Sequence, residues 1–262
     1  MSQPTTSYTV MFAAGICLIC SLFVSGAAVA LKDRQDANKV LDKQKKVLAV
    51  AGLIEEGASP SATEVDAIFA EKISARVIDM KSKQEVNDPA FDFKGYDAIK
   101  ASKDPATSIE VAANKAKVGR LPARQVVYCV KEGEGCGQYI FPVEGKGLWS
   151  TMYGFLSLDK DLTTVKGITF YAHGETPGLG GEIDNKGWKA LWPGRKVFKD
   201  DGSVALRVIK GKAGDVASDP HRVDGLAGAT LTANGVTNLL AFWLGPDGFK
   251  GYIDNLKSGS AG

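Results

Sequence analysis

The sequence predicts an α+β protein, in which a single N-terminal transmembrane helix is followed by a soluble mixed α/β domain with an antiparallel-rich sheet. Three observations support this class. The 262-residue chain opens with a long uncharged apolar segment, its second half alternates short β-rich runs with glycine-rich turns, and an apolar helical run follows near the C-terminus. The apolar content of 44% is ordinary for a chain that buries a core.

The first element is an apolar segment from Tyr8 to Leu31 that contains no charged residue. About 20 apolar residues are enough for an α-helix to cross the hydrocarbon core of a bilayer. The alternative is a signal peptide, because Ala28-Val29-Ala30 has the small-x-small pattern of a cleavage site. No Lys or Arg precedes the segment, however, as a signal peptide would require. We therefore expect an uncleaved anchor over residues 1–35.

The charges around the span bear on its orientation and on possible partners. Six basic residues follow the span and none precedes it: Lys32, Arg34, Lys39, Lys43, Lys45 and Lys46. The positive-inside rule, taken alone, therefore favours a cytoplasmic domain. Over the whole chain 32 basic residues nearly balance 30 acidic ones, so nothing in the charge indicates a nucleic acid as partner.

The four cysteines form two pairs. Cys129 and Cys136 flank a glycine-rich turn between two strand-like runs, where a hairpin would let them form a disulfide in an oxidising compartment. Two reduced thiols fit the same spacing equally well. Cys17 and Cys20 lie inside the apolar span with no other metal ligand nearby, so we expect them to be ordinary apolar positions.

Residues 36–123 are expected to form a helical and irregular connecting region packed on the domain. A helix over 32–53 continues from the span, and a second helix begins near Ser61 or Thr63. Its apolar positions recur at helical spacing: Val65, Ile68, Phe69 and Ile73. The polar stretch 79–119, with two Asp-Pro turns, predicts loops and short elements.

Residues 124–262 are expected to form the β-rich domain. Runs at 125–130 and 138–143 predict two strands around the glycine-rich turn, and runs at 148–158 and 165–171 predict a second antiparallel pair. A further strand is expected over 204–209. These strands alternate with turns and not with long helices, which favours an antiparallel meander.

The loop from His173 to Glu182 carries three glycines around Leu179, so its backbone can approach a flat ligand closely. Several site types are excluded here. His173-Gly174-Glu175 lacks the P-C-x-x-C that a zinc deaminase needs, and two histidines in the whole chain are too few for an ordinary catalytic zinc site. No Rossmann fingerprint, phosphate-binding P-loop or serine-nucleophile motif occurs. We expect no catalytic residue and no metal site.

The nonapeptide from Asp224 to Thr232 resembles the acceptor site at which flavin mononucleotide (FMN) is esterified through its phosphate to a threonine. Thr230 is the acceptor in that motif, with Gly228 and Ala229 keeping its approach open and Asp224 helping to position the donor. The simpler alternative is that Thr230 only caps the following helix. The two roles are compatible, because a helix N-terminus also favours phosphate groups.

Three sequence blocks occur in one order, at 147–153, 174–182 and 223–232. With the apolar anchor, they resemble the family of C subunits of bacterial Na+-translocating NADH:quinone oxidoreductases, which carry a covalent FMN-binding domain. The resemblance covers the anchor and most of the second half of the chain. The family's motif commonly has Ser or Thr where this chain has Ala227.

The resemblance implies that the loop from Glu175 to Gly181 lies against the isoalloxazine ring. The candidate cofactor residues are then Thr230, Asp224, Gly228, Ala229, Trp149, Glu175, Thr176, Gly178, Leu179, Gly180 and Lys210. Trp149 and Leu179 would cover the ring, Thr176 would bond its polar edge, and Lys210 would offset the phosphate charge. Four of these residues have a structural alternative: a core position for Trp149, a turn for Thr176, a solvated surface position for Lys210, and for Glu175 a role that only pins the loop.

The resemblance also implies a function. FMN would relay single electrons from an iron-sulfur centre to the flavin of a neighbouring membrane protein, in a complex that oxidises NADH, reduces ubiquinone and exports Na+. A flavin transferase would be needed for maturation. The domain would face the periplasm from the bacterial inner membrane, against the charge rule. Two alternatives stay open: the flavin subunit of a ferredoxin:NAD+ oxidoreductase complex, and an unmodified membrane-anchored scaffold.

Overall fold

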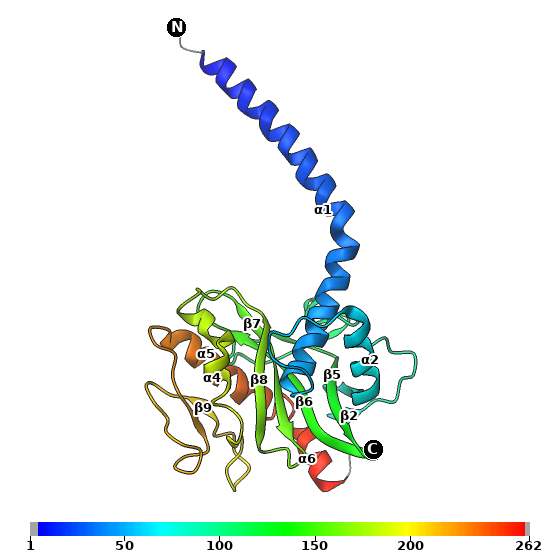
Figure 1. Ribbon diagram of the computed structural model, residues 1–262, viewed down its shortest axis with the longest axis vertical. Coiled ribbons are helices and arrows are strands. Elements are labelled where there is room, and N and C mark those ends of the chain that lie inside the picture. Colours follow the sequence, from blue (N-terminus) through cyan, green and yellow to red (C-terminus); the bar gives the residue numbers. More distant parts are fainter. Residues whose placement is uncertain (1–4, 260–262) are drawn as a thin grey trace. The chain divides into compact units, whose positions relative to one another are not determined.

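The computed structural model describes residues 5–259 of the chain, which divides into two compact units over residues 1–42 and 43–262. The first unit consists of most of one long helix, α1 (Thr6–Val50). The second holds the end of α1 and all the other elements (Figure 1).

Helix α1 confirms the expected N-terminal apolar helix. Among residues 5–259 it is the one helix long and apolar enough to cross a membrane, with a mean hydropathy of 2.3 over its most apolar 18 residues and none of that window buried. The helix runs on without a break through the charged residues after Leu31 and ends at Val50. The free cysteines Cys17 and Cys20 are exposed on it.

The second unit is built on a six-stranded antiparallel sheet in the order β2-β1-β5-β6-β7-β8. Its strands are β1 (Ile73–Asp79), β2 (Gln84–Glu85), β5 (Arg124–Glu132), β6 (Gly135–Lys146), β7 (Thr151–Asp159) and β8 (Val165–Ala172). The last four form the meander that the alternating runs predicted. The antiparallel-rich α+β fold is therefore confirmed.

Strand β1 was not expected from the sequence. Helix α2 (Ala62–Lys72) starts with a capping box between Ser61 and Glu64, but it ends before Ile73, which adopts an extended conformation. From Ile73 onward the chain pairs with β5, in a register that runs from Ile73↔Val130 to Asp79↔Arg124. The prediction of Ile73 as a helical position was wrong, because pairing with a strand about 50 residues later leaves no signal in local spacing.

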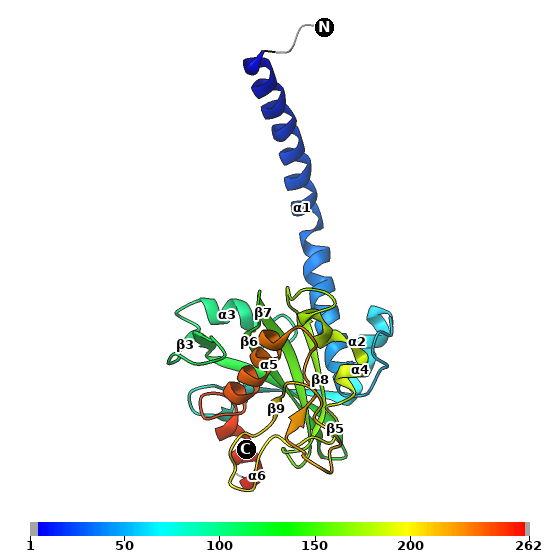
Figure 2. The same ribbon diagram turned by 90° about the vertical axis from the view of Figure 1, so that its left-hand side faces the viewer.

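The two faces of the sheet are covered by different helices. Helix α5 (Thr230–Trp243) packs on β6, and the Trp243 indole donates to the Glu144 carbonyl at 2.7 Å. The other face holds the end of α1, where Val47 and Leu48 are fully buried, and α2, whose Phe69 ring meets Tyr128 edge-on at 5.6 Å. Figures 1 and 2 show α5 and the end of α1 on opposite sides of the sheet.

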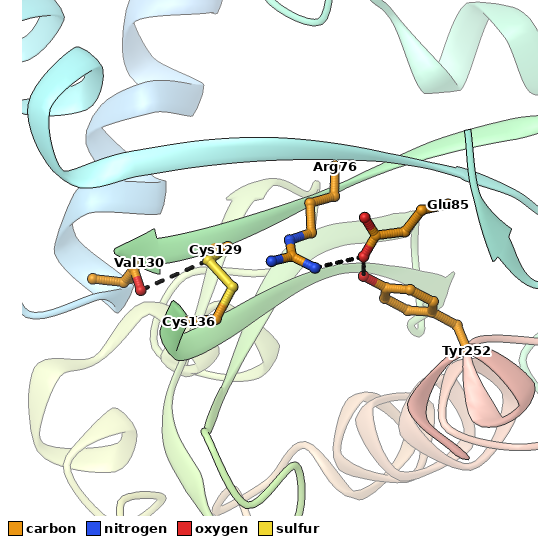
Figure 3. The surroundings of a disulfide bond; sticks show 6 residues. All are labelled: Arg76, Glu85, Cys129, Val130, Cys136 and Tyr252. Atoms are coloured by element: carbon orange, nitrogen blue, oxygen red, sulfur yellow. Dashed lines mark hydrogen bonds and ion pairs between the residues drawn. A yellow bond between two sulfur atoms is a disulfide. The ribbon is translucent and has the colours of Figure 1, made fainter. Parts of the chain in front are cut away.

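The β5–β6 hairpin is closed by a disulfide between Cys129 and Cys136, with a Cα–Cα distance of 5.5 Å. Of the two arrangements that the spacing allowed, the structure therefore has the disulfide. In the same region (Figure 3), Glu85 accepts hydrogen bonds from the Arg76 guanidinium and the Tyr252 hydroxyl, both at 2.6 Å. This network joins β1 and β2 to the C-terminal helix α6 (Lys250–Ser258).

The remaining elements are short. The polar stretch 79–119 contains α3 (Ala98–Lys103) and β3 (Ser108–Glu110), and β3 pairs with β4 (Arg120–Pro122). The expected strand over 204–209 is reduced to β9 (Arg207–Val208), which pairs in parallel with β10 (Arg222–Val223). The glycine-rich loop leads into the 3₁₀ helix η1 (Gly180–Asp184) and the single turn α4 (Lys186–Lys189). Of these short elements, β9 and η1 contact α5.

Candidate functional site

Thr230 is the first residue of α5, and it is exposed. The position before it is occupied by Ala229, and within residues 5–259 no side chain caps the helix by a hydrogen bond. The first N–H groups of an α-helix have no partner inside the helix. The interpretation of Thr230 as a mere helix cap is therefore wrong, because the residue lies one position too late and its hydroxyl makes no cap bond. That hydroxyl is available for chemistry.

The segment before Thr230 is a turn anchored in the core. Leu226 and Ala229 are buried, whereas Ala227 and Gly228 between them are exposed. Gly228 has a φ of +70°, a backbone conformation that glycine adopts without strain. A Cβ added there would lie 2.9 Å from Leu179 Cδ2. The turn thus brings the glycine-rich loop into contact with the acceptor motif, although about 50 residues separate them in sequence.

A cavity of ≈ 460 Å³ opens beside Thr230. Its walls are the 208–212 segment, which includes Lys210 and Lys212, and the motif itself with the first turn of α5. Both lysines are exposed. The volume falls within the range of roughly 300–1,000 Å³ that is usual for small-molecule sites. An exposed hydroxyl, a helix N-terminus and two ammonium groups therefore share one cavity, a combination suited to a phosphate ester.

Asp224 holds the wall of this cavity in place. Its carboxylate accepts a hydrogen bond from the Ala213 N–H at 2.8 Å and pairs with Lys212 at 2.9 Å. Burial raises the pKa of Asp224, but these two bonds outweigh burial and keep the pKa below its usual value. Its carbonyl accepts from the buried Trp188 indole at 2.9 Å. In the described structure, Asp224 thus fixes the loop that carries Lys210.

Glu175 is buried, with 4% of its surface exposed, and it joins the other two sequence blocks. Its carboxylate accepts hydrogen bonds from the N–H groups of Leu148, Trp149 and Ser150 at 2.9–3.1 Å, and from the Thr232 hydroxyl at 2.6 Å. Burial raises the pKa of Glu175, but the four bonds outweigh it and hold the pKa below the usual value. The side chain is therefore an ionised buried carboxylate near neutral pH.

The glycine-rich loop presents an apolar side chain at its tip. The N–H groups of Leu179 and Gly181 both donate to the Thr176 carbonyl, at 3.1 and 2.8 Å, so Thr176 opens a tight turn. Gly178 within it has a φ of +76°. Leu179 is 45% exposed and Trp149 is 66% exposed. The alternative of Trp149 as a core residue is therefore wrong, and both side chains are free to contact a ligand.

His173 has a structural role in the same loop. Its Nε2 lies 2.8 Å from Asp184, and its Nδ1 accepts from the Glu175 N–H at 3.2 Å. In the part of the chain that the structure describes, no group of three or more His, Cys, Asp or Glu residues is arranged to hold a metal ion.

Two residues of the site were not anticipated from the sequence. Thr232, the third residue of α5, is fully buried and bonds Glu175, and Lys212 reaches the same cavity as Lys210. The sequence offers only a weak indication that Thr232 is a buried hydrogen-bond donor, because the acceptor motif already explains a threonine at that position. Lys212 offers no local pattern that separates it from a solvated lysine.

Comparison with known proteins places these features among related chains. A family model described as FMN-binding domain matches residues 147–245. The chain is also similar to the C subunits of Na+-translocating NADH-quinone reductases from several bacteria. That of Pseudomonas aeruginosa is 49% identical, covering 99% of both chains, and that of Vibrio anguillarum is 46% identical, covering 96% of this chain and 95% of its own.

Two solved structures have the same fold. The crystal structure of NqrC from Shewanella oneidensis has a TM-score of 0.75 at 32% identity and covers 85% of this chain and 99% of its own. The second, from Parabacteroides distasonis, is likewise one of the C subunits of Na+-translocating NADH-quinone reductases. It has a TM-score of 0.63 at 25% identity, covering 85% of this chain and 96% of its own.

Proposed function

Because the chain belongs to the family of C subunits of Na+-translocating NADH-quinone reductases, we propose that it carries electrons on an FMN esterified through its phosphate to Thr230. The family membership expected from the three sequence blocks is confirmed, and with it the assignment to an oxidoreductase complex. The two alternatives to this assignment were a flavin subunit of a ferredoxin:NAD+ oxidoreductase complex and an unmodified membrane-anchored scaffold.

The observation that carries the proposal is the exposed Thr230 hydroxyl at the start of α5, beside a cavity that also holds Lys210 and Lys212. A phosphodiester on Thr230 Oγ1 would lie at the helix N-terminus, where unpaired N–H groups and the helix dipole favour an anion. The Lys210 ammonium would offset its charge, and Lys212, whose ammonium already pairs with Asp224, would add a smaller part. Thr230 thus fits a covalent tether, and the cavity has the chemistry of a phosphate site.

Attachment needs an activated donor, because a threonine hydroxyl is a weak nucleophile. With a flavin dinucleotide as donor, Thr230 Oγ1 would form a bond to the flavin-side phosphorus as the pyrophosphate P–O bond breaks. Adenosine monophosphate would leave, and a base of the enzyme that catalyses the transfer would take the hydroxyl proton. Ala229 and Gly228 leave the approach open, which suits a maturation enzyme acting from outside the chain.

The ring of the tethered cofactor would be held by packing. Trp149 and Leu179 are exposed apolar side chains on the two loops that meet at Glu175, and Leu179 lies next to Gly228. Aromatic and aliphatic side chains bury the faces of a flat ring well. Bound FMN would supply one-electron transfer, while the chain sets the position of the cofactor and shields it from water.

The other steps of the overall reaction would take place on other subunits of the complex. The described residues offer no arrangement of three or more metal-binding side chains, and the sequence has no dinucleotide-binding fingerprint. We therefore assign NADH oxidation, ubiquinone reduction and Na+ transport to other subunits of the membrane complex. The tethered FMN would take electrons from an iron-sulfur centre and deliver them to a flavin of a neighbouring subunit.

We place the domain on the periplasmic side of the bacterial inner membrane. The Cys129–Cys136 disulfide supports this orientation, because disulfides persist in oxidising compartments. The positive-inside rule points the other way, but acidic residues at 33, 36 and 42 dilute the basic cluster, and partner helices can set the topology of a single span.

The test is covalent flavin on the purified, denatured chain after co-expression with a flavin transferase. The native chain should fluoresce in a denaturing gel and show a mass increase equal to FMN less one water, mapped to the peptide that contains Thr230. Thr230→Ala should lose both signals. Thr63→Ala, which alters another exposed threonine in the first turn of a helix, is the matched control and should keep them. A flavin-sized adduct on Thr230→Ala would reject the assignment.

A further inference from the structure

The carboxylate of Glu175 is the point where three distant segments of the chain meet. Glu175 belongs to the 173–181 loop, three of its hydrogen-bond donors belong to the 147–150 loop, and the fourth is Thr232 in the first turn of α5. Each segment supplies one part of the proposed flavin site: Leu179, Trp149 and Thr230. A single side chain therefore links the parts of that site.

The hydrogen-bonding capacity of Glu175 is fully used within the protein. One oxygen, Oε1, accepts from the N–H groups of Trp149 and Ser150 at 2.9 and 3.1 Å. The other, Oε2, accepts from the Leu148 N–H at 3.1 Å and the Thr232 hydroxyl at 2.6 Å. An ionised carboxylate offers about four lone-pair positions. None is left for a ligand.

The backbone closes around the carboxylate on two sides. A Cβ added at Gly147 would lie 2.6 Å from Glu175 Oε1, and one added at Gly180 would lie 2.8 Å from Oε2. Only glycine permits such close approach of a main chain to a side chain. Together with its 4% exposure, this leaves no path by which a cofactor could touch the carboxylate.

We propose that Glu175 is a positioning residue and not a flavin ligand: it holds Trp149 and the start of α5 in place before the flavin is attached. The inference deepens the proposed function and rests on it for the identity of the cofactor. Its physical basis is the buried carboxylate, which accepts charge-assisted hydrogen bonds from three loop N–H groups and one hydroxyl. Such bonds fix a loop more firmly than neutral hydrogen bonds do. A site that is already ordered loses less conformational entropy when the ligand binds.

Glutamine at this position tests the role of the charge at nearly constant shape. With its amide oxygen in the place of Oε1, Glu175→Gln keeps the bonds from Trp149 and Ser150. Its NH₂ group then faces the Leu148 N–H, which places two donors together and leaves that N–H unpaired. Thr232→Val is the matched variant, since it removes one bond to the carboxylate, keeps the negative charge and preserves the shape of the side chain.

The first experiment measures amide hydrogen exchange in the cofactor-free full-length chain, using the Thr230→Ala background in detergent. Glu175→Gln should speed exchange of the 148–150 amides by roughly tenfold or more, and Thr232→Val should speed it less. The Lys146 amide, which donates to the Ala116 carbonyl at 2.8 Å, is the internal reference and should not change. Unchanged exchange at 148–150 in both variants would overturn the proposal. If Glu175→Gln does not fold, Thr232→Val alone decides it by the same readout.

The second experiment measures the midpoint potential of the attached flavin. Removing a buried negative charge beside the site should make reduction easier, so Glu175→Gln should raise the potential. Thr232→Val retains the charge and should leave the potential unchanged. A shift in both variants would reject the electrostatic part of the proposal. If the native chain carries no covalent flavin, the proposed function fails, and the exchange measurement still tests the positioning role of Glu175.

Discussion

At the scale of single residues, the site depends on backbone positions as much as on functional groups. Thr230 and Glu175 differ sharply in exposure. Thr230 presents its hydroxyl to solvent, whereas the charged carboxylate of Glu175 is buried and bonded within the protein. Asp224 resembles Glu175, because its carboxylate also holds a loop. The two acidic residues that the sequence indicated as cofactor contacts thus both hold loops in place, so in the proposed site the contacts with the ligand would come from Trp149, Leu179, Lys210 and Thr230.

Gly228 gives a prediction at this scale. Alanine at a φ of +70° should destabilise the fold by about 1 kcal/mol, and its Cβ would also displace Leu179, 2.9 Å away. We therefore expect Gly228→Ala to lower both the free energy of unfolding and the fraction of chains that carry flavin. Denaturant titration and flavin absorbance per chain measure the two effects.

The matched control is Gly52→Ala. Gly52 has a φ of +73°, and a Cβ there would meet no heavy atom of residues 5–259 within 4 Å. Its substitution should lower stability by a similar amount and leave flavin loading intact. Equal flavin loading in the two variants would show that the contact between Gly228 and Leu179 does not matter.

At the scale of elements, local sequence patterns predicted β5 to β8 well, because each strand is a β-rich run bounded by glycine-rich or polar turns. They failed at β1, whose partner lies far along the chain, and at 204–209, where a run of six residues yields only the two-residue strand β9. The site was likewise predictable only in its local segments. The acceptor motif and the glycine-rich loop were recognisable as segments, but the contact between Leu179 and Gly228 and the Glu175–Thr232 bond arise only when α5 packs on the sheet.

Strand β6 carries a prediction about pH. Burial raises the pKa of its Glu144 to about 7, although Lys103 partly lowers it. Between the ordinary value of 4.5 and about 7, the folded chain therefore holds a proton that the unfolded chain has released. Stability should fall as the pH rises through this window and stay level above it.

Glu144→Gln removes this titration. We expect it to raise the free energy of unfolding by on the order of 2 kcal/mol at about pH 8 and to have little effect at about pH 5. Urea unfolding of the full-length chain at several pH values, followed by a signal from residues 43–262, measures this difference in the free energy of unfolding. Glu132→Gln on β5 controls for the loss of one exposed negative charge. Equal gains for Glu144→Gln at both pH values would contradict the raised pKa.

At the scale of the whole molecule, the chain joins an apolar helix to a disulfide-containing domain. A C-terminal alkaline phosphatase fusion should be active in bacterial cells, because this reporter needs an oxidising compartment to form its own disulfides. A fluorescent-protein fusion that matures only in the cytoplasm should stay dark. The opposite pattern would place the domain in the cytoplasm and follow the positive-inside rule.

Thiol labelling provides a second measurement of the same topology. In cells treated with a thiol reagent without reductant, Cys129 and Cys136 should resist labelling, and they should react after reduction. A chain with Cys17 and Cys20 replaced by alanine isolates this signal from the helix thiols. Labelling of Cys129 and Cys136 before reduction would indicate a reducing compartment.

The sequence by itself determined the long apolar helix, the antiparallel-rich domain and the family, and it indicated Thr230 as the proposed acceptor, because apolar length, β-rich runs between turns and short motifs are local properties. Only the tertiary structure decided that Thr230 begins its helix uncapped, that Trp149 is exposed, that Cys129 and Cys136 are bonded, and that Glu175 is enclosed by four donors. The physical reason is that burial and hydrogen-bond satisfaction depend on segments far apart in the chain, which meet only when α5 and the two loops pack together.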